Sequence, residues 1–320
     1  MQFIGFLKNW TLPLGMTAGA AAYLILSHIE ALAPCKPAMM AGVSIVQPVL
    51  IFLMLFLTFC RVRPSDFRLR RWHITMLLFQ GVATLLIALP LIVLPQAPWH
   101  VVLESAMLCL VCPTATAAAV VTRRLGGDVA SVTTYTIFIN TLVALLLPAL
   151  LPWVHPDAGS AFAVNLFRIA GHTFPMLVVP MLLSLFLRWY RPRWVEALAN
   201  LHDLPFYLWT FSLSLAIAVT TRSIVHSHCS VVYMLSIAIV SLVACAIQFA
   251  LGHHLGSREG DTVSATQAGG QKNTVFIIWL GYTFMSPITS LAGGFYSVWH
   301  NVYNSYQLYR QRKAIDKNRG

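Results

Sequence analysis

The chain has 320 residues, of which 58% are hydrophobic and only 10% are charged, and its mean hydropathy is +0.73. A soluble domain carries roughly 25% charged residues, so this composition excludes an ordinary soluble protein and predicts a multi-pass membrane protein. The net charge of +11 would suggest nucleic-acid binding in a soluble chain. Here the cations lie in loops between apolar runs, so we expect membrane lipid and no nucleic acid as a partner. The expected location is a cell membrane, specifically a bacterial inner membrane.

A membrane-spanning helix requires about 20 predominantly apolar residues. Ten stretches of the sequence meet this requirement or come close to it. In chain order they are 10–29, 38–60, 72–94, 100–122, 129–154, 161–190, 201–221, 229–252, 262–283 and 285–309. The fourth and the ninth are the weakest, because small or polar residues interrupt them. The sequence therefore predicts an all-α membrane protein with ten transmembrane helices.

Lysine and arginine are concentrated in every second loop between the expected spans. These loops and the C-terminal tail hold Arg61, Arg63, Arg68, Arg70, Arg71, Arg123, Arg124, Arg188, Arg191, Arg193, Arg258, Arg310, Arg312, Lys313, Lys317 and Arg319. The loops on the opposite side hold only Lys36 and Arg222. Cytoplasmic loops carry the excess of positive charge in membrane proteins. Both termini are therefore predicted to be cytoplasmic, which requires an even number of spans.

The ten spans divide into two halves of five, residues 1–154 and residues 155–320. An odd number of spans gives the two halves opposite orientations, so they would form an inverted repeat. The fourth span of each half is broken, at Pro113–Thr116 in the first and at Gly269–Asn273 in the second. Paired interruptions at matching positions of inverted halves indicate the binding site of a secondary transporter. The alternative is that proline and glycine are common in ordinary membrane helices.

The segment Thr266–Thr274 is the most polar part of any expected span and includes adjacent glycines and Lys272. Non-helical backbone survives at membrane depth only where it is buried in protein or lines a wet cavity. A lysine at that depth is costly and is by default a functional residue. We therefore expect a helix broken near the middle of the membrane. The alternative is a polar loop between two shorter segments.

The sequence contains three further motifs, at Pro64–Arg68 with Gln80, at Cys112–Thr122 and at Ser297–Asn301. They resemble motifs of a known family, the bile acid:sodium symporters. Pro64–Arg68 with Gln80 is similar to that family's loop and the third helix behind it, Cys112–Thr122 to its fourth-helix signature, and Ser297–Asn301 to its last helix. The resemblance implies a panel of spans 1, 2, 6 and 7 and a core of the other six, with the broken spans 4 and 9 crossing in the core. It also implies two sodium ions beside that crossing and an organic anion bound between core and panel.

The residues that would hold sodium differ from the family pattern. Ala118-Ala119 replaces a Ser-Asn pair that offers oxygen atoms to sodium in the fourth helix. The family's acidic residue in the ninth helix has no counterpart near Thr266, and Lys272 is added. Two like charges 4 Å apart repel by about 4 kcal/mol at an effective dielectric constant of about 20. We therefore predict that sodium does not bind and that Lys272 replaces it as the cation of the core.

Lys272 has more than one possible role in coupling. A charged amine is costly to bury, so this group would be able to load and release a proton as the site alternates between the two sides. Alternatively, it stays charged and is purely structural. The remaining alternative is a sodium-coupled symporter of the usual kind. No cofactor other than these coupling ions is expected.

Two groups of side chains are predicted to form the transport site. The candidates for ion coupling are Gln80, Thr136, Asn140, Thr266, Gln267, Gln271 and Lys272. The candidates for substrate binding are Thr114, Thr116, Asn165, Arg168, His172 and Asn273. The two-pronged guanidinium of Arg168 suits a carboxylate or sulfonate, unless this side chain extends to the lipid headgroups instead. The predicted substrate is a small or amphipathic organic anion.

Few other residues suggest chemistry. Glu104 lies inside the fourth span, where it would either relay protons or mark the outer interface. The pair His226 and His228 has no carboxylate nearby and predicts no metal site, and the six cysteines are expected to be inert buried thiols. The sequence contains neither a His-Glu-x-x-His zinc motif nor a Gly-x-Ser-x-Gly elbow, which argues against an enzyme. A membrane sensor that has lost transport is a third class, because fold alone does not fix function.

Overall fold

The computed structural model describes residues 2–29, 34–61, 63–156, 161–201, 204–226 and 229–317. Their regular elements are helices, apart from one isolated β-bridge, which confirms the all-α prediction. The helices are α1 (Gln2–His28), α2 (Lys36–Cys60), α3 (Arg71–Val93), α4 (His100–Val111), α5 (Thr116–Arg124), α6 (Val129–Val154), α7 (Phe162–Leu177), α8 (Val179–Tyr190), α9 (Pro192–Ala199), α10 (Leu204–Val225), α11 (Val231–Ser257), α12 (Thr262–Gly270), α13 (Thr274–Phe284) and α14 (Leu291–Lys317), with a 3-10 turn at Pro64–Asp66. Asp157 at the expected junction of the halves, His228 and Arg319 lie outside the described residues.

The helices differ from the expected spans in three places. The sixth stretch is not one straight helix, because α7 and α8 meet at Val178 with a bend of 43°. Pro175 and Pro180 flank this bend, and a proline inside a helix removes a backbone donor and clashes with the preceding turn. The sequence did not predict the short helix α9, which begins at Pro192. The last helix, α14, begins at Leu291 and not at residue 285, nearly two helical turns later than expected.

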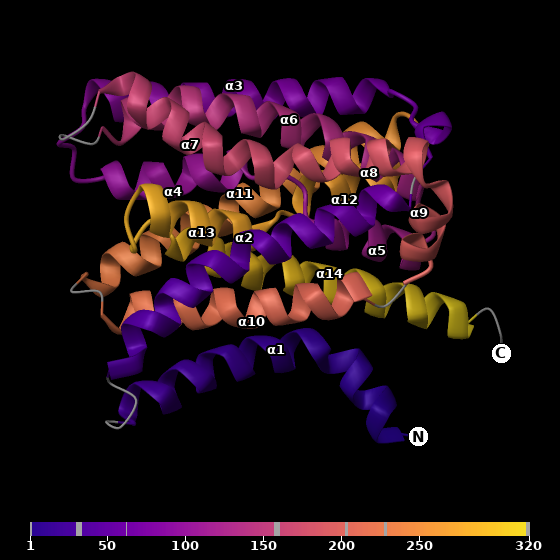
Figure 1. Cartoon of the computed structure of the whole chain (residues 1–320), viewed down its shortest axis with the longest axis horizontal. Helices are drawn as coiled ribbons and strands as arrows, with labels where there is room; N and C mark the ends of the chain where they lie inside the picture. The colour runs from indigo at the N-terminus through magenta and orange to yellow at the C-terminus, as the bar shows by residue number, and fades with distance from the viewer. Residues whose placement is uncertain are drawn as a thin grey trace.

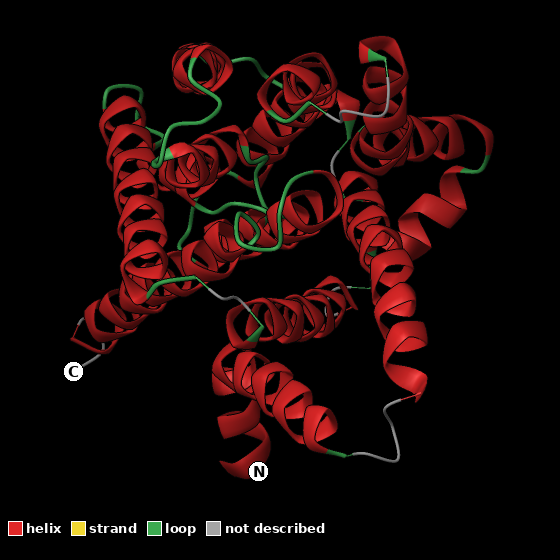
Figure 2. Cartoon of the chain, turned by 90° about the vertical axis from the view of Figure 1, so that its left-hand side faces the viewer, coloured by secondary structure: helices red, strands yellow, loops and turns green. Residues whose placement is uncertain are grey.

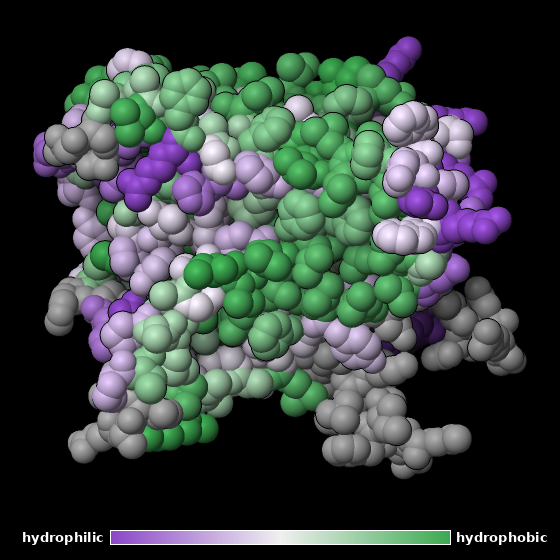
Figure 3. Space-filling model, in the orientation of Figure 1, coloured by the Kyte–Doolittle hydropathy of each residue, from purple (hydrophilic) through white to green (hydrophobic). Residues whose placement is uncertain are grey.

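Long apolar helices identify a multi-pass membrane protein. Among the described residues five helices are long and apolar enough to cross a membrane, and the bent pair of α7 and α8 brings the number to as many as six. Figure 3 shows apolar side chains across the middle of the molecule and polar side chains gathered at its two ends. Figure 1 shows both termini at the same end. The complete arrangement of ten spans remains a prediction.

The helices pack in two groups. One contains α1, α10, α2 and α8, which contact one another in that order, and the other contains α3, α4, α6, α11, α12 and α14. Figure 2 shows α1, near the N-terminus, at the outside of the first group. The two half-helices that follow the breaks, α5 and α13, contact members of both groups. α7 packs mainly against α6 and also contacts α2 and α8, so the two groups meet along this helix as well. The panel and core that the family resemblance implies remain a prediction.

Candidate functional site

The two interrupted segments meet and pair with each other. The first break, residues 112–115, joins α4 to α5, and the second break, residues 271–273, joins α12 to α13. The pairing consists of an antiparallel bridge between Thr114 and Lys272 and of two backbone hydrogen bonds of 2.9 Å, from Ala115 N to Gln271 O and from Asn273 N to Pro113 O. Backbone groups that each break sets free are therefore satisfied by the other break, as membrane depth requires.

Proline and glycine explain why the helices end at these points. Pro113 has no amide hydrogen, so α4 cannot continue through it with regular bonds. A side chain at Gly269 would come within 2.8 Å of Gln248 O, and one at Gly270 would overlap the ring of Phe249. Glycine therefore lets the end of α12 lie directly against α11.

Two helices begin at the breaks, α5 at Thr116 and α13 at Thr274. The first amide groups of a helix have no partner within the helix and carry partial positive charge. Asn273 caps α13 by accepting a hydrogen bond from Phe276 N at 3.3 Å, whereas Ala115 gives α5 no side-chain cap. The predicted substrate residues Thr116 and Asn273 thus stand at two helix N-termini, which favour negative groups.

Lys272 is fully buried at the second break, and its Nζ has no hydrogen-bond partner among the described residues. Both amide atoms of Gln271 and of Asn140 on α6 are likewise buried and without a partner there. Buried polar atoms are nearly always hydrogen-bonded in proteins. These three predicted coupling residues therefore have bonding capacity that the fold itself does not use.

Of the other predicted coupling residues, Thr136 and Thr266 use their hydroxyls within the fold. Gln267 uses its amide nitrogen there, whereas its Oε1 is buried without a partner among the described residues. The hydroxyls of Thr136 and Thr266 donate to carbonyls of their own helices, at 2.8 Å and 2.6 Å. Gln267 Nε2 donates to Gln307 Oε1 of α14 at 2.6 Å. The two threonines therefore bond within their own helices, and Gln267 bonds α12 to α14.

Gln80 belongs to a network that reaches both breaks. Its Nε2 donates to Leu110 O at 2.7 Å and to Gln248 Oε1 at 3.2 Å, and its Oε1 accepts from the hydroxyl of Tyr135. Gln248 Nε2 donates to Tyr296 Oη at 3.1 Å, and Tyr296 Oη donates to the last carbonyl of α12 at 2.9 Å. Sequence reasoning found only Gln80. A glutamine inside the apolar eighth stretch was the signal available for Gln248.

The predicted substrate residues fall in several places rather than in one pocket. Asn165 and Arg168 line a cavity of about 300 Å³ at the end of α6, which we call the α6-end cavity; its other lining residues are Pro152, His155, Pro156, Ile169, Thr283, Phe284 and Met285. Thr116 lines a smaller cavity of about 60 Å³ together with Thr58, Arg61, Ala119, Val120, Arg123, Val129 and Thr133. Thr114 Oγ1 donates to Ala268 O at 2.7 Å between the breaks. His172 is exposed, with Nδ1 2.7 Å from Arg168 O and its ring 5.6 Å from that of Phe284.

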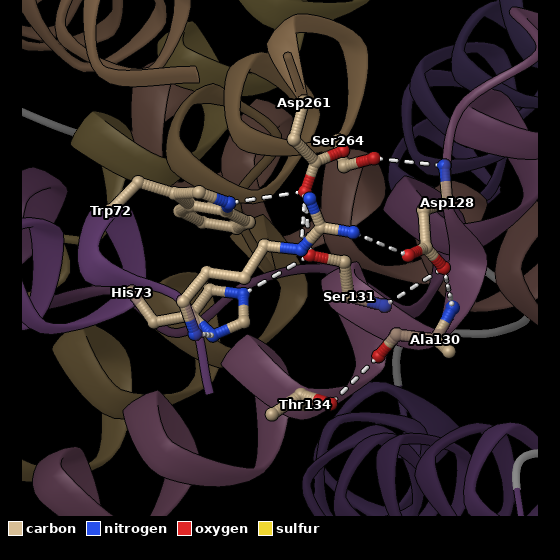
Figure 4. Close-up of polar contacts among 9 residues, drawn as sticks. Trp72, His73, Asp128, Ala130, Ser131, Thr134, Asp261 and Ser264 are labelled. Atoms are coloured by element: carbon tan, nitrogen blue, oxygen red, sulfur yellow. Dashed lines mark hydrogen bonds and ion pairs between the residues drawn. The ribbon is translucent and has the colours of Figure 1, made fainter. Parts of the chain in front are cut away.

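A polar cluster that the sequence reasoning missed lies at the start of α12. Asp261 Oδ2 accepts hydrogen bonds from Ser131 Oγ at 2.7 Å and from Trp72 Nε1 at 3.0 Å, and it lies 3.4 Å from Arg70 Nε. Arg70 also pairs with Asp128, the N-cap of α6, at 3.0 Å. Figure 4 shows Trp72, Ser131 and Asp128 gathered around Asp261. The cluster ties together the adjoining ends of α3, α6 and α12.

Glu104 is buried inside the fold, with a side chain that is 2% exposed. Thr289 Oγ1 donates to its Oε2 at 2.9 Å. His100 Nε2 and His155 Nδ1 lie 3.2 Å and 3.1 Å from its Oε1. The carboxylate therefore joins α4 to the end of α6 and to the turn before α14.

Residues 48–245, more than half of the chain, match the sequence profile of the Sodium Bile acid symporter family. The chain belongs to this family. Its members are secondary active transporters and not enzymes, so the chain is a membrane transporter that carries a small-molecule substrate. No curated protein matches the chain.

The family match covers the first break of this transporter but ends within α11, before the second. Ala118 and Ala119 lie inside the matched range, and Lys272 lies beyond it. The family match therefore includes the first break and not the second.

Proposed function

We propose that this transporter moves a small organic anion by alternating access, on ten spans that form two inverted five-span halves with both termini cytoplasmic. The antiparallel pairing of the first break with the second is the observation that carries the proposal. Each break interrupts the fourth expected span of its half. Broken helices at matching positions of two inverted halves are where secondary transporters bind their substrates and coupling ions.

The charges around the candidate sites favour an anion. Arg168 lines the α6-end cavity, and Arg61 and Arg123 line the smaller one. A guanidinium forms two parallel hydrogen bonds with a carboxylate or sulfonate. The N-terminus of α5, at Thr116 in the lining of the smaller cavity, and that of α13 at the second break add partial positive charge. Phe284 and Ile169 give the α6-end cavity apolar walls. A substrate that combines one anionic group with an apolar body fits these properties.

Lys272 supports transport without the family's sodium ions. Its ammonium group has three donors, and the unpartnered side-chain oxygens of Gln271 and Asn140 are acceptors of the kind it requires. The methyl groups of Ala118 and Ala119 offer no oxygen to a metal. A lysine Nζ about 4 Å from a sodium ion would oppose its binding by about 4 kcal/mol at an effective dielectric constant of about 20. Membership of a sodium symporter family favours the alternative, a sodium-coupled carrier.

Transport in proteoliposomes tests this function. A thermal-shift screen of organic anions, in sodium buffer and in choline buffer, first identifies ligands that stabilise the purified protein. Counterflow of those ligands is then measured with either cation present. We expect counterflow that does not depend on sodium. Stimulation by sodium would establish the alternative, and binding without any counterflow would identify a sensor.

Labelling of introduced cysteines tests the topology. An Asp66→Cys variant should react only from the cytoplasmic side, and an Asp157→Cys variant only from outside, since positively charged loops are retained in the cytoplasm. The labelling uses a variant in which the six natural cysteines are replaced. The reverse pattern would exclude the proposed orientation.

A further inference from the structure

Two hydrogen bonds join α14 to α12, one at each end of a polar stretch of α14. Tyr296 Oη donates to Gly270 O at 2.9 Å, and Gln267 Nε2 donates to Gln307 Oε1 at 2.6 Å. Positions 296 and 307 are about three helical turns apart, or roughly 16 Å. Figure 1 shows that α14 continues from here to the end of the molecule where both termini lie. The polar stretch therefore lies between the second break and that end.

Buried polar atoms without a partner lie between these two hydrogen bonds. His300 is 1% exposed and Asn304 is 4% exposed, and neither ring nitrogen of the first nor amide atom of the second has a hydrogen-bond partner among the described residues. Oε1 of Gln267 is buried and unpartnered there in the same way. His300 and Asn304 follow Tyr296 at intervals of four residues, and residues at this spacing share one face of a helix. That face contacts α12, so the unpartnered atoms lie where the two helices meet.

The chemistry of these atoms indicates which molecule would satisfy them. A neutral imidazole has one donor and one acceptor, and a primary amide has both kinds as well. A metal cation would require acceptors alone, and an anion would require donors alone. Water donates and accepts, and a buried water molecule typically forms about three hydrogen bonds with polar groups that have no other partner. The mixed set of atoms at His300, Asn304 and Gln267 therefore fits bound water and not an ion.

The unpartnered atoms continue a hydrogen-bond network in one direction and approach the surface in the other. Tyr296, whose ring centre lies 5.7 Å from that of His300, belongs to the network that reaches both breaks. Gln311 lies one helical turn beyond Gln307, is half-buried, and has an Oε1 without a partner among the described residues. Ionisable side chains inside membrane spans belong to proton relays, and an imidazole can pass a proton between its two nitrogens.

We propose that His300, Asn304 and Gln267 hold a chain of water molecules through which protons pass between the second break and the end of α14. This inference rests on the proposed function, transport without sodium, and adds a route for a coupling proton. In each transfer one ring nitrogen of His300 takes up a proton from a water molecule. The other ring nitrogen releases its proton to the next water molecule, so the ring is neutral again.

X-ray radiolytic footprinting of the purified protein tests the water chain. Radiolysis produces hydroxyl radicals from water, so a buried histidine is oxidised where water is bound beside it. The matched control is His73, which is 0% exposed and has Nδ1 3.1 Å from Arg70 N and Nε2 3.2 Å from Ser131 Oγ. His300 should be oxidised at least about threefold faster than His73, because its nitrogens require water as their partner. Equal, slow oxidation of the two histidines would overturn the proposal.

Hydrogen–deuterium exchange at the ring of His300 tests whether the chain reaches the solvent. The exchange is followed by NMR of the protein in nanodiscs, with ¹⁵N-labelled histidine, and His300→Gln identifies the signal by its loss. Asn304→Leu should slow the exchange by at least about tenfold, because it removes two polar partners of the chain. The control is Tyr306→Phe at an exposed position of α14, which should exchange as the wild type does. Unchanged exchange in a folded Asn304→Leu protein, or a wild-type ring that exchanges as slowly as that of His73, would contradict the route.

A second variant covers the case in which Asn304→Leu does not fold. Gln311 is only half-buried, so Gln311→Leu should fold and should also slow the exchange at His300. The water chain and the proposed function fail separately, because neither measurement involves transport. Oxidation and exchange of His300 in a protein without counterflow of any anion would support the chain and remove the transport function. Counterflow together with a His300 that is not oxidised would do the reverse.

Discussion

The two breaks pair with each other through their backbones but differ in side-chain chemistry. The first break contains Pro113, and the carbonyl of Leu110, just before the break, accepts a hydrogen bond from the amide of Gln80. The second break follows two glycines, and its preceding carbonyl is held by the hydroxyl of Tyr296. In both cases a polar side chain from another helix donates to a backbone carbonyl near the end of the broken helix.

The two breaks differ in whether their polar side chains have hydrogen-bond partners in the described structure. At the first break Thr114 gives its hydroxyl to Ala268 O, so its polar side chain is used up. At the second break Lys272 and Gln271 are buried with unpartnered polar atoms. The comparison indicates that the first break is a structural half of the crossing, and that the second carries the group available for coupling.

Replacement of Lys272 by methionine should give the largest functional effect. Methionine fills a similar volume without a charge, and it removes a buried ammonium that has no partner in the described structure, so the folded protein should lose no stability. Uptake of the anion should nevertheless fall by at least about tenfold, because the crossing loses the cation proposed to replace sodium. Proteoliposome uptake and thermal unfolding measure the two effects. The control is Lys313→Met at the exposed end of α14, which should change neither. Full uptake by the Lys272→Met protein would mean that the second break does not carry a group required for coupling.

Gln80→Leu should have the largest effect on stability. The substitution leaves Leu110 O, the amide oxygen of Gln248 and the hydroxyl of Tyr135 without this partner. Each buried polar group left unsatisfied costs about 1–3 kcal/mol, so the loss from these groups together should be at least about 3 kcal/mol. Gln47→Leu is a matched control on α2, since Gln47 is equally buried but its amide nitrogen has no partner in the described structure. Denaturation in detergent measures the stability of both variants. Equal losses of stability would show that the hydrogen bonds of Gln80 do not stabilise the first break.

Part of this arrangement was predictable from the sequence and part was not. Apolar runs and loop arginines indicate membrane helices because the bilayer acts on each segment separately. Lys272 and the breaks were predictable for the same reason, since a polar residue or a proline in an apolar run is visible locally. The partners of Gln80 and the contacts of Asp261 were not predictable, because they depend on which helices pack together. The bend at Val178 was also missed, because proline is common in membrane helices that stay straight enough to read as one span.

Gly270→Ala tests whether close packing sets the position of the second break. A methyl group at Gly270 would overlap the ring of Phe249, and overpacking of this kind typically costs about 1–3 kcal/mol. Gly42→Ala is the matched control, because no atom lies within 4 Å of the methyl position there. Replacement of a helical glycine by alanine where the methyl group meets no other atom should stabilise the protein by about 0.5–1 kcal/mol. Thermal unfolding measures the stability of both variants. If Gly270→Ala did not change the stability, the position of the second break would not depend on close packing of α12 against α11.

Thr114→Val should give the smallest effect, and it isolates the side-chain contact between the breaks. Valine keeps the shape of threonine and removes the hydroxyl that donates to Ala268 O at 2.7 Å, while the backbone pairing with Lys272 remains. The net contribution of one such hydrogen bond is about 0.5–1.5 kcal/mol. Thr136→Val is the control, since that hydroxyl donates to a carbonyl of its own helix and should contribute less. If the first break has a purely structural role, Thr114→Val should lower the stability by about 1 kcal/mol and leave uptake per folded protein unchanged. A loss of uptake without a loss of stability would place a transport role on the first break as well, and the two breaks would then share the coupling site.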